Sequence, residues 1–222
     1  MAALIDDLRM LIERGGYVMY PLLALSVVSL SLILERAVFW LLLHRKARLR
    51  RLAMLNNAMR RGDRTKARQL IAQDGSPYGR VALALLEHGP SDAVAVEAVQ
   101  VHRPGLERFM ITLSTIITAA PLLGILGTVM GIIQSFKLLG AQTTISDPND
   151  VATGIAAALL TTAVGLIIAL FTLFPYMIYR GQVDRALGRL ESLIASAQQG
   201  QSAVQNSPMN RPDRPIQGRS AS

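Results

Sequence analysis

Three long stretches of the chain carry no charged residue. They cover residues 15–34, 109–136 and 151–179 and contain 20, 28 and 29 residues. An apolar helix of about 20 residues is long enough to cross the roughly 30 Å hydrocarbon core of a bilayer. A soluble domain of this size has no core that could bury three such helices. The pattern therefore predicts an all-α integral membrane protein with three long transmembrane helices that extend into the cytoplasm.

The first of these helices continues beyond its uncharged part, because a second apolar run, residues 37–43, follows the charged pair Glu35 and Arg36. We therefore predict one transmembrane helix over residues 16–43, longer than the apolar region of a cleaved secretory signal. Since Glu35 and Arg36 lie near the end of this helix, we expect a local ion pair, or side chains that reach the interface, rather than a transport site.

The second and third stretches, residues 109–136 and 151–179, would form helices roughly 42 to 44 Å long, which exceeds the hydrocarbon core. Beyond the third, apolar residues recur at helical spacing up to Ile194, which predicts a cytoplasmic helix extension over residues 180–199. Residues 200–222 are polar and Pro-containing without apolar periodicity, a composition typical of a disordered tail.

Residues 44–108 alternate between helical patterns and helix-breaking residues, which predicts a helical loop. Breaks are expected at Gly62 and Gly89, with Ser91 as an N-cap. Pro104 should break or kink the approach to the second transmembrane helix. The predicted helices cover residues 46–61, 64–73, 78–88 and 91–101.

Basic residues determine the expected orientation, because they are retained on the cytoplasmic side of a membrane. Residues 44–108 carry 13 Lys and Arg against 6 acidic residues, and residues 180–222 carry 6 Arg against 3 acidic residues. Residues 1–15, a predicted amphipathic helix, and the short connection 137–150 have more acidic than basic residues. We therefore expect the first two of these segments to be cytoplasmic and the last two to face outward.

The net charge of +8 follows from this distribution and does not indicate nucleic-acid binding, because aromatic residues are nearly absent among the basic ones. The chain has no Cys and three His that are not at ligand spacing, so neither a disulfide framework nor a metal site is expected. The membrane segments contain no His or Asp. We expect no catalytic residue, no metal, no cofactor and no enzymatic activity.

Small and polar residues form a stripe along one side of each of the last two membrane segments, at steps of three or four residues. In residues 109–136 the stripe consists of Ser114, Thr118, Pro121, Gly124, Thr128, Gly131 and Ser135. In residues 151–179 it consists of Gly154, Ala158, Thr162, Gly165, Ala169 and Thr172, with Ala157 and Thr161 beside it.

Two interpretations of these stripes remain open. Small residues allow close helix packing, and Gly127 with Gly131 makes a small-xxx-small pattern. Alternatively, the stripes line a hydrated passage in which Ser and Thr hydroxyls relay protons. Neither stripe contains a carboxylate, so a proton path would need a titratable group from another chain.

Both stripe-bearing segments resemble the MotA/TolQ/ExbB proton channel family, in its ExbB/TolQ-like branch. Residues 120–136, APLLGILGTVMGIIQSF, are similar to the second-span signature of that family, and residues 154–166, GIAAALLTTAVGL, to its third-span signature. The triplet from Leu34 to Arg36, the basic loop and the expected topology are similar too.

The resemblance implies a helical subunit that forms a homo-oligomeric ring, typically a pentamer, in membrane lipid. It also implies the bacterial inner membrane, with residues 1–15 and 137–150 periplasmic. The ring would surround the single membrane helices of an ExbD/TolR-type partner that supplies a protonatable Asp. Proton motive force would then drive biopolymer transport or mechanical work in the envelope. By motif position, Thr128 and Thr162 correspond to the pore-facing hydroxyls of the family, and Pro121 corresponds to its second-span proline.

From the stripes and the resemblance together we expect two sets of site residues. The proton-path set is Thr128, Thr162, Thr161, Ser114, Thr118 and Ser135. The helix-packing and kink set is Pro121, Gly124, Gly127, Gly131, Gly154, Ala157 and Gly165.

Two departures from the family pattern favour a diverged member. Ala157 stands where many relatives carry Glu, so that carboxylate has no role here. Phe171 stands where a proline often ends the third-span motif, and Pro175 follows one turn later. The main alternative function is a passive membrane scaffold or assembly protein; a solute carrier is disfavoured by three spans without an internal repeat.

Overall fold

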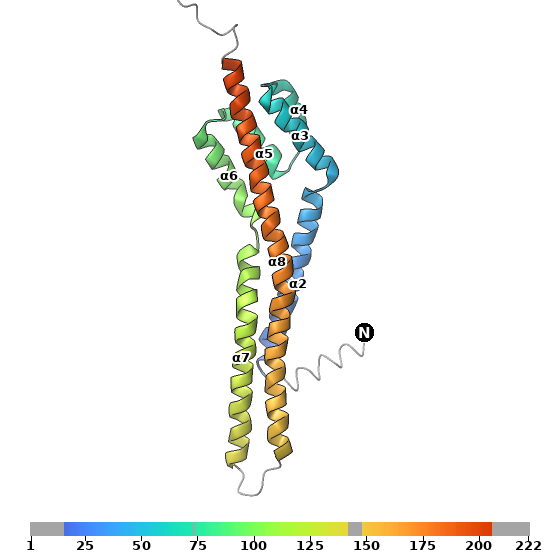
Figure 1. Ribbon diagram of the computed structural model, residues 1–222, viewed down its shortest axis with the longest axis vertical. Helices are drawn as coiled ribbons and strands as arrows, with labels where there is room; N and C mark the ends of the chain where they lie inside the picture. Colours follow the sequence, from blue (N-terminus) through green and yellow to red (C-terminus); the bar gives the residue numbers. More distant parts are fainter. Residues whose placement is uncertain (1–15, 73, 142–147, 206–222) are drawn as a thin grey trace, which may run out of the picture. The chain divides into compact units, whose positions relative to one another are not determined.

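The computed structural model describes residues 16–72, 74–141 and 148–205, which form helices and no strand (Figure 1). The predictions for residues 1–15 and for most of the polar tail therefore lie outside the described residues. The helices are α2 (Met19–Leu43), α3 (Lys46–Arg60), α4 (Arg64–Ala72), α5 (Pro77–His88), α6 (Asp92–Leu106), α7 (Met110–Ala141) and α8 (Pro148–Gln205).

Three of the described helices, α2, α7 and α8, are long and apolar enough to cross a membrane. The prediction of an all-α membrane protein with three long transmembrane helices and a helical loop is therefore confirmed. Helix α8 continues without a break through Pro175 over 58 residues. A membrane helix tolerates such a proline because local adjustment and neighbouring groups satisfy the carbonyl that it leaves without an N–H donor.

The chain divides into two compact units. The membrane unit consists of Met1–Trp40 and Glu107–Gly181, and the loop unit consists of Leu41–Leu106 and Gln182–Ser222. Helix α8 contributes its first part to the membrane unit and its last part to the loop unit.

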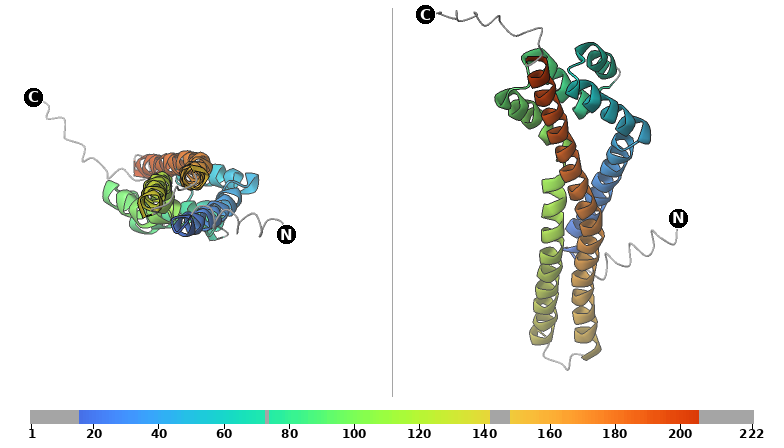
Figure 2. Two further views of the ribbon diagram at one scale, coloured as in Figure 1. Left: turned by 90° about the horizontal axis from the view of Figure 1, so that it is seen from below. Right: turned by 45° about the horizontal axis from the view of Figure 1, so that its top comes forward.

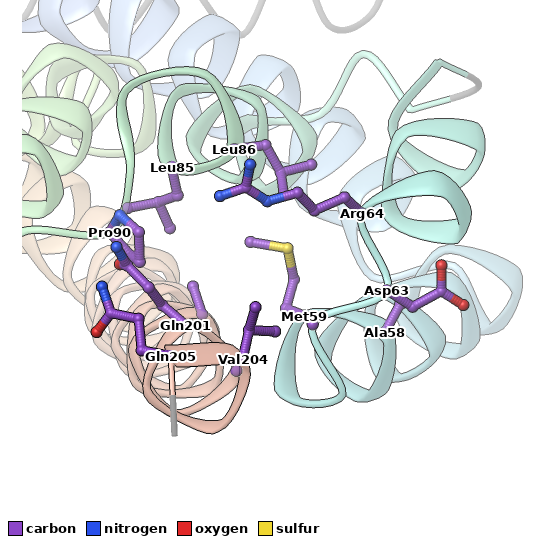
Figure 3. A pocket seen from close by; sticks show the side chains of 13 residues that line it. Ala58, Met59, Asp63, Arg64, Leu85, Leu86, Pro90, Gln201, Val204 and Gln205 are labelled. Atoms are coloured by element: carbon purple, nitrogen blue, oxygen red, sulfur yellow. The ribbon is translucent and has the colours of Figure 1, made fainter. Parts of the chain in front are cut away.

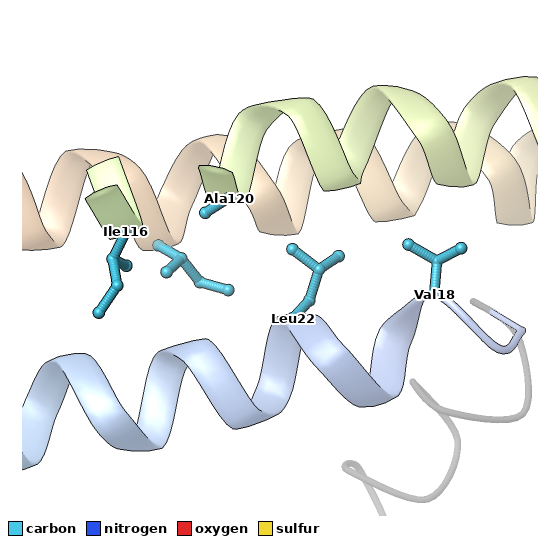
Figure 4. Close-up of a cluster of buried hydrophobic side chains, with 5 residues drawn as sticks. Val18, Leu22, Ile116 and Ala120 are labelled. Atoms are coloured by element: carbon cyan, nitrogen blue, oxygen red, sulfur yellow. The ribbon is translucent and has the colours of Figure 1, made fainter. Parts of the chain in front are cut away.

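Within the membrane unit, α7 and the first part of α8 lie side by side as an antiparallel hairpin (Figures 1 and 2). The start of α2 packs against this hairpin through bulky side chains. Val18 and Leu22 meet Ile116 and Ala120 of α7 and Ile168 of α8 in one buried cluster (Figure 4).

Within the loop unit, glycines with positive φ angles and serine N-caps determine where the helices begin and end. Gly62 and Gly89 adopt positive φ angles of +69° and +81° between successive helices, a conformation that glycine adopts without strain. Ser76 caps α5 by accepting from the Gly79 N–H, and Ser91 accepts from the Val94 N–H at the start of α6. The four predicted loop helices and the Ser91 cap are confirmed.

Two expectations about helix ends were wrong. Helix α6 continues past its predicted end at residue 101, through Pro104 to Leu106, because the fixed φ of proline, about −65°, is compatible with a helix. The chain turns instead just before α7, at Phe109, whose φ is +64°.

Helix α8 continues to Gln205, six residues past its predicted end, although its sequence there is polar. Gly200 packs directly against the Met59 carbonyl, and the Val204 side chain lies against Gly62. Tertiary contacts therefore hold a segment whose local composition favours disorder.

Candidate functional site

Helices α7 and α8 approach each other through glycines. A Cβ added at Gly124 would lie 2.9 Å from the Thr161 carbonyl oxygen, and one added at Gly165 would lie 2.5 Å from the Ala120 carbonyl oxygen. Both distances are shorter than van der Waals contact, so these positions accept only hydrogen as a side chain. The two helix backbones are therefore in direct contact, as small residues allow in lipid.

The same close approach continues along the two helices. Gly127 contacts the Thr161 side chain, a Cβ at Gly131 would lie 2.6 Å from the Ala158 Cβ, and Gly154 faces the Ser135 hydroxyl. The parts of the two predicted stripes from Gly124 to Ser135 and from Gly154 to Gly165 thus face each other within one chain.

Three threonines meet at the centre of this contact, and we call Thr128, Thr161 and Thr162 the hydroxyl cluster. The Thr162 hydroxyl donates to the Gly124 carbonyl over 2.9 Å. Thr161 Oγ1 lies 2.7 Å from the Ala158 carbonyl oxygen and 3.1 Å from that of Gly124. Thr128 Oγ1 lies 3.2 Å from each of the same two oxygens.

The hydroxyls of Thr128 and Thr162 are also hydrogen-bonded to each other, and either can be the donor. Each hydroxyl has one proton and can accept two hydrogen bonds. When one of the two hydroxyls donates to the other, the acceptor is free to donate its own proton to a backbone carbonyl. The pair can therefore form its hydrogen bonds in two orientations.

The members of the hydroxyl cluster differ in exposure. Thr161 is fully buried, whereas Thr128 and Thr162 are only half-buried. In the single chain, those two side chains remain accessible from the surface of the hairpin.

The structure does not bring the other predicted path residues into the cluster. Ser135 is buried, donates to the Gly131 carbonyl over 3.0 Å and belongs to the contact with Gly154. Thr118 is exposed and donates to the Thr115 carbonyl of its own helix, while Ser114 is half-buried. Pro121 and Ala157, from the predicted packing set, are half-buried.

A second polar contact in the membrane unit escaped sequence reasoning. The hydroxyls of Ser29 on α2 and Thr172 on α8 are 2.6 Å apart, and both side chains are buried. The Tyr179 hydroxyl donates to the Ile33 carbonyl over 2.9 Å. The sequence signal for this contact is the pair of Ser26 and Ser29, which lie three residues apart on one face of the first span.

Glu35 and Arg36 form the predicted local ion pair. Arg36 Nε donates to Glu35 Oε2 over 2.6 Å, and Nη2 donates to Oε1 over 3.0 Å. The guanidinium lies 4.5 Å from the centre of the Phe39 ring and 5.4 Å from that of Phe109. Because Arg36 is only 1% exposed, it is part of the packing of α2 rather than a side chain that extends to the interface.

Comparison with known proteins identifies the family. The family model described as the MotA/TolQ/ExbB proton channel family matches residues 87–192. The Synechocystis biopolymer transport protein ExbB-like 3 is 35% identical over 175 residues, which cover 75% of this chain and 81% of that protein. The chain belongs to the MotA/TolQ/ExbB proton channel family.

Two further members show the breadth of the similarity. The Vibrio cholerae biopolymer transport protein exbB1 is 28% identical over 85% of this chain and 86% of its own length. The Pseudomonas aeruginosa Tol-Pal system protein TolQ is 36% identical over 38% of this chain and 36% of its own length. The predicted resemblance to the ExbB/TolQ-like branch of the family is thus confirmed, and the match contains the whole hydroxyl cluster. The protein is a multi-pass membrane protein of a proton channel family.

Proposed function

We propose that this chain is the ring-forming subunit of an inner-membrane motor. Together with an ExbD/TolR-type single-span partner, it couples proton motive force to transport or mechanical work in the cell envelope. In this role the chain is a transport component and not an enzyme. The hydroxyl cluster forms its part of the proton path, and the partner supplies the protonatable Asp.

The observation that carries this proposal is the hydroxyl cluster, with Thr128 and Thr162 half-buried in a hairpin that has no acidic group at membrane depth. Residues 109–136 and 151–179 contain no charged residue. Hydroxyls can relay a proton but cannot hold it as a stable charge, so the titrating group must come from elsewhere. A single-span partner with a membrane Asp fits this requirement.

We propose that the chain assembles into a homo-oligomeric ring, a pentamer. The half-buried hydroxyls of Thr128 and Thr162 are accessible at the surface of the single chain, and the ring would shield them from lipid. In the assembly we place the accessible side of α7 and α8 toward the ring interior and neighbouring subunits, and α2 toward lipid. Cross-links between subunits should then concentrate on α7 and α8.

We further propose that residues 44–108 and 180–222 are cytoplasmic and that residues 1–15 and 137–150 are periplasmic. Gln69 is exposed on α4 and the chain has no Cys, so Gln69→Cys gives a single probe. It should resist a membrane-impermeant thiol reagent in intact spheroplasts and react after permeabilisation. Labelling in intact spheroplasts would reverse the proposed orientation.

The direct test of function is co-expression with an ExbD/TolR-type single-span protein, followed by purification and reconstitution into liposomes. We expect a complex with several copies of this chain and a proton flux that requires both proteins. As a control, the partner Asp is replaced by Asn, which should leave the complex intact and abolish the flux. A complex that forms but never conducts protons would refute the proposal.

The second candidate is a passive membrane scaffold. It is favoured by one observation: all three hydroxyls of the cluster find acceptors within the chain itself. Hydrogen bonds between membrane helices contribute to packing without any transport role. A scaffold would assemble with its partner but would show no flux, so the reconstitution separates the two functions.

A further inference from the structure

The loop unit contains a pocket that the proposed proton path does not use. It lies among the α3–α4 turn, the end of α5 and the end of α8 (Figure 3), and encloses about 620 Å³ including its open mouth. Met59, Leu85 and Ala197 line its interior and are buried. Arg64, Gln201 and Gln205 stand at its edge.

The walls of this pocket are held in place by close backbone contacts. The Gly200 Cα on α8 packs against the Met59 carbonyl of α3, where a Cβ would collide with the oxygen. Gly62, at a φ of +69°, turns the chain toward α4 and receives the Val204 side chain. These contacts hold the α3–α4 turn against the end of α8, so two walls of the pocket keep their spacing.

The polar groups at its edge are available to a ligand. Among the residues that the structure describes, the side chains of Arg64, Gln201 and Gln205 have no ion-pair or hydrogen-bond partner. Asp63 forms no ion pair with Arg64, since its carboxylate accepts from the Lys66 N–H and points away from the pocket (Figure 3).

The chemistry of the lining selects one class of ligand. An apolar interior accommodates an aliphatic side chain, and a guanidinium binds a carboxylate with charge-assisted hydrogen bonds. Gln201 and Gln205 lie one helical turn apart, and each carboxamide offers both a donor and an acceptor, which match the N–H and C=O of an extended peptide.

Charge distinguishes between the possible occupants. Residues 41–106 and 182–205 together carry 14 Lys and Arg against 7 Asp and Glu, so the unit attracts acidic segments. The segment of this chain that follows Gln205 carries three Arg and one Asp, so the same charge repels it.

We propose that this pocket binds an acidic peptide segment of another protein. One aliphatic side chain of the segment enters the interior beside Met59 and Leu85, a neighbouring carboxylate pairs with Arg64, and the peptide groups bond to Gln201 and Gln205. This inference is independent of the proton path, so either proposal can fail without the other.

The test uses the full-length protein in mild detergent and fluorescently labelled heptapeptides. The first probe has Leu at its centre and Glu at the other six positions, the second replaces Leu by Ser, and the third replaces each Glu by Lys. We expect the Glu–Leu peptide to bind, the Ser peptide to bind about tenfold more weakly because its hydroxyl leaves the apolar interior unfilled, and the Lys peptide not to bind.

Two variants locate the site. Arg64→Gln should weaken binding of the Glu–Leu peptide about tenfold or more, whereas Arg50→Gln, a matched change at an exposed residue of α3 outside the pocket, should change it much less. Thermal unfolding confirms that both variants are folded.

Several outcomes would overturn the proposal. Equal losses in the two Arg variants, or equal binding of the Leu and Ser peptides, would indicate general attraction to a basic surface. Binding that appears only when the chain is cut after Gln205 would make its own tail the occupant. If no acidic peptide binds, the pocket is not a peptide site. The comparison of the Leu and Ser peptides uses the unmodified protein, so it tests the proposal even if a variant misfolds.

Discussion

The membrane unit contains two helix contacts built in opposite ways. Helices α7 and α8 meet backbone to backbone at Gly124 and Gly165, and threonine hydroxyls fill the remaining space. Helix α2 meets the same hairpin through large side chains such as Leu22 and Ile116, with one hydroxyl pair between Ser29 and Thr172.

The difference has an energetic meaning in lipid. Burying apolar surface between membrane helices gives little gain over contact with lipid tails, so packing and hydrogen bonds decide which helices associate. The α7–α8 contact has no room for an added atom. The α2 contact depends on side-chain volume, so a change of side-chain size there should destabilise the protein less than an added atom between α7 and α8. We therefore expect α7 and α8 to act as one rigid element that carries the hydroxyl cluster.

The largest effect on stability should come from adding one carbon to the α7–α8 contact. Gly165→Ala places a Cβ 2.5 Å from the Ala120 carbonyl oxygen and should destabilise the protein by about 3 kcal/mol through overpacking. Gly188→Ala on the same helix meets open space and should be neutral or stabilising by roughly 0.5–1 kcal/mol. Thermal unfolding in detergent measures both, and similar stability of the two variants would contradict the close contact.

A smaller effect is expected from removing volume at the α2 contact. Leu22 is fully buried, so Leu22→Ala leaves a cavity that should cost about 2 kcal/mol, less than in many soluble cores because lipid is as apolar as the interior. Leu30→Ala, at an exposed position of the same helix, is the control and should change stability little. If Leu22→Ala were harmless, α2 would not be held by this cluster.

The smallest effect should come from the hydroxyl pair between α2 and α8. Thr172→Val keeps the shape of the side chain and removes its bond to Ser29, which should cost about 0.6 kcal/mol. Ser29→Ala should cost a similar amount, and the double variant should cost no more than either single one if the bond is the shared cause. A double-mutant cycle of unfolding free energies gives the coupling directly, and additive losses would show that the two hydroxyls act separately.

The sequence predicted the helices of this protein well because each signal is local. The length of the uncharged stretches predicted α2, α7 and α8. The breaks between the loop helices were predicted from Gly62, Gly89 and Ser91. The small residues of the two stripes also predicted a close contact. The end of α8 could not be predicted in the same way, because Gly200 and Val204 are held by residues of the α3–α4 turn, more than 130 positions earlier in the chain.

The sequence predicted which residues belong to the candidate site but not which hydrogen bonds they form. Thr128, Thr161 and Thr162 were expected to take part in the path, yet their shared acceptors, the Gly124 and Ala158 carbonyls, depend on the register between two helices. A one-residue change in register would separate them. Ser114 and Thr118 lie on the same stripe as Thr128 but outside the cluster. The pattern on one helix does not predict which part of its length contacts the partner helix.

The central claim is that the hydroxyl cluster conducts protons and does more than join two helices. It is tested most directly by proton flux in liposomes that contain this chain and its single-span partner. The double variant Thr128→Val, Thr162→Val keeps side-chain shape and removes both half-buried hydroxyls, while Thr172→Val removes a buried hydroxyl outside the cluster. We expect all complexes to keep their oligomer size, the double variant to lose most of its flux, and Thr172→Val to retain it. Normal flux in the double variant would contradict the account and leave helix packing as the role of the cluster.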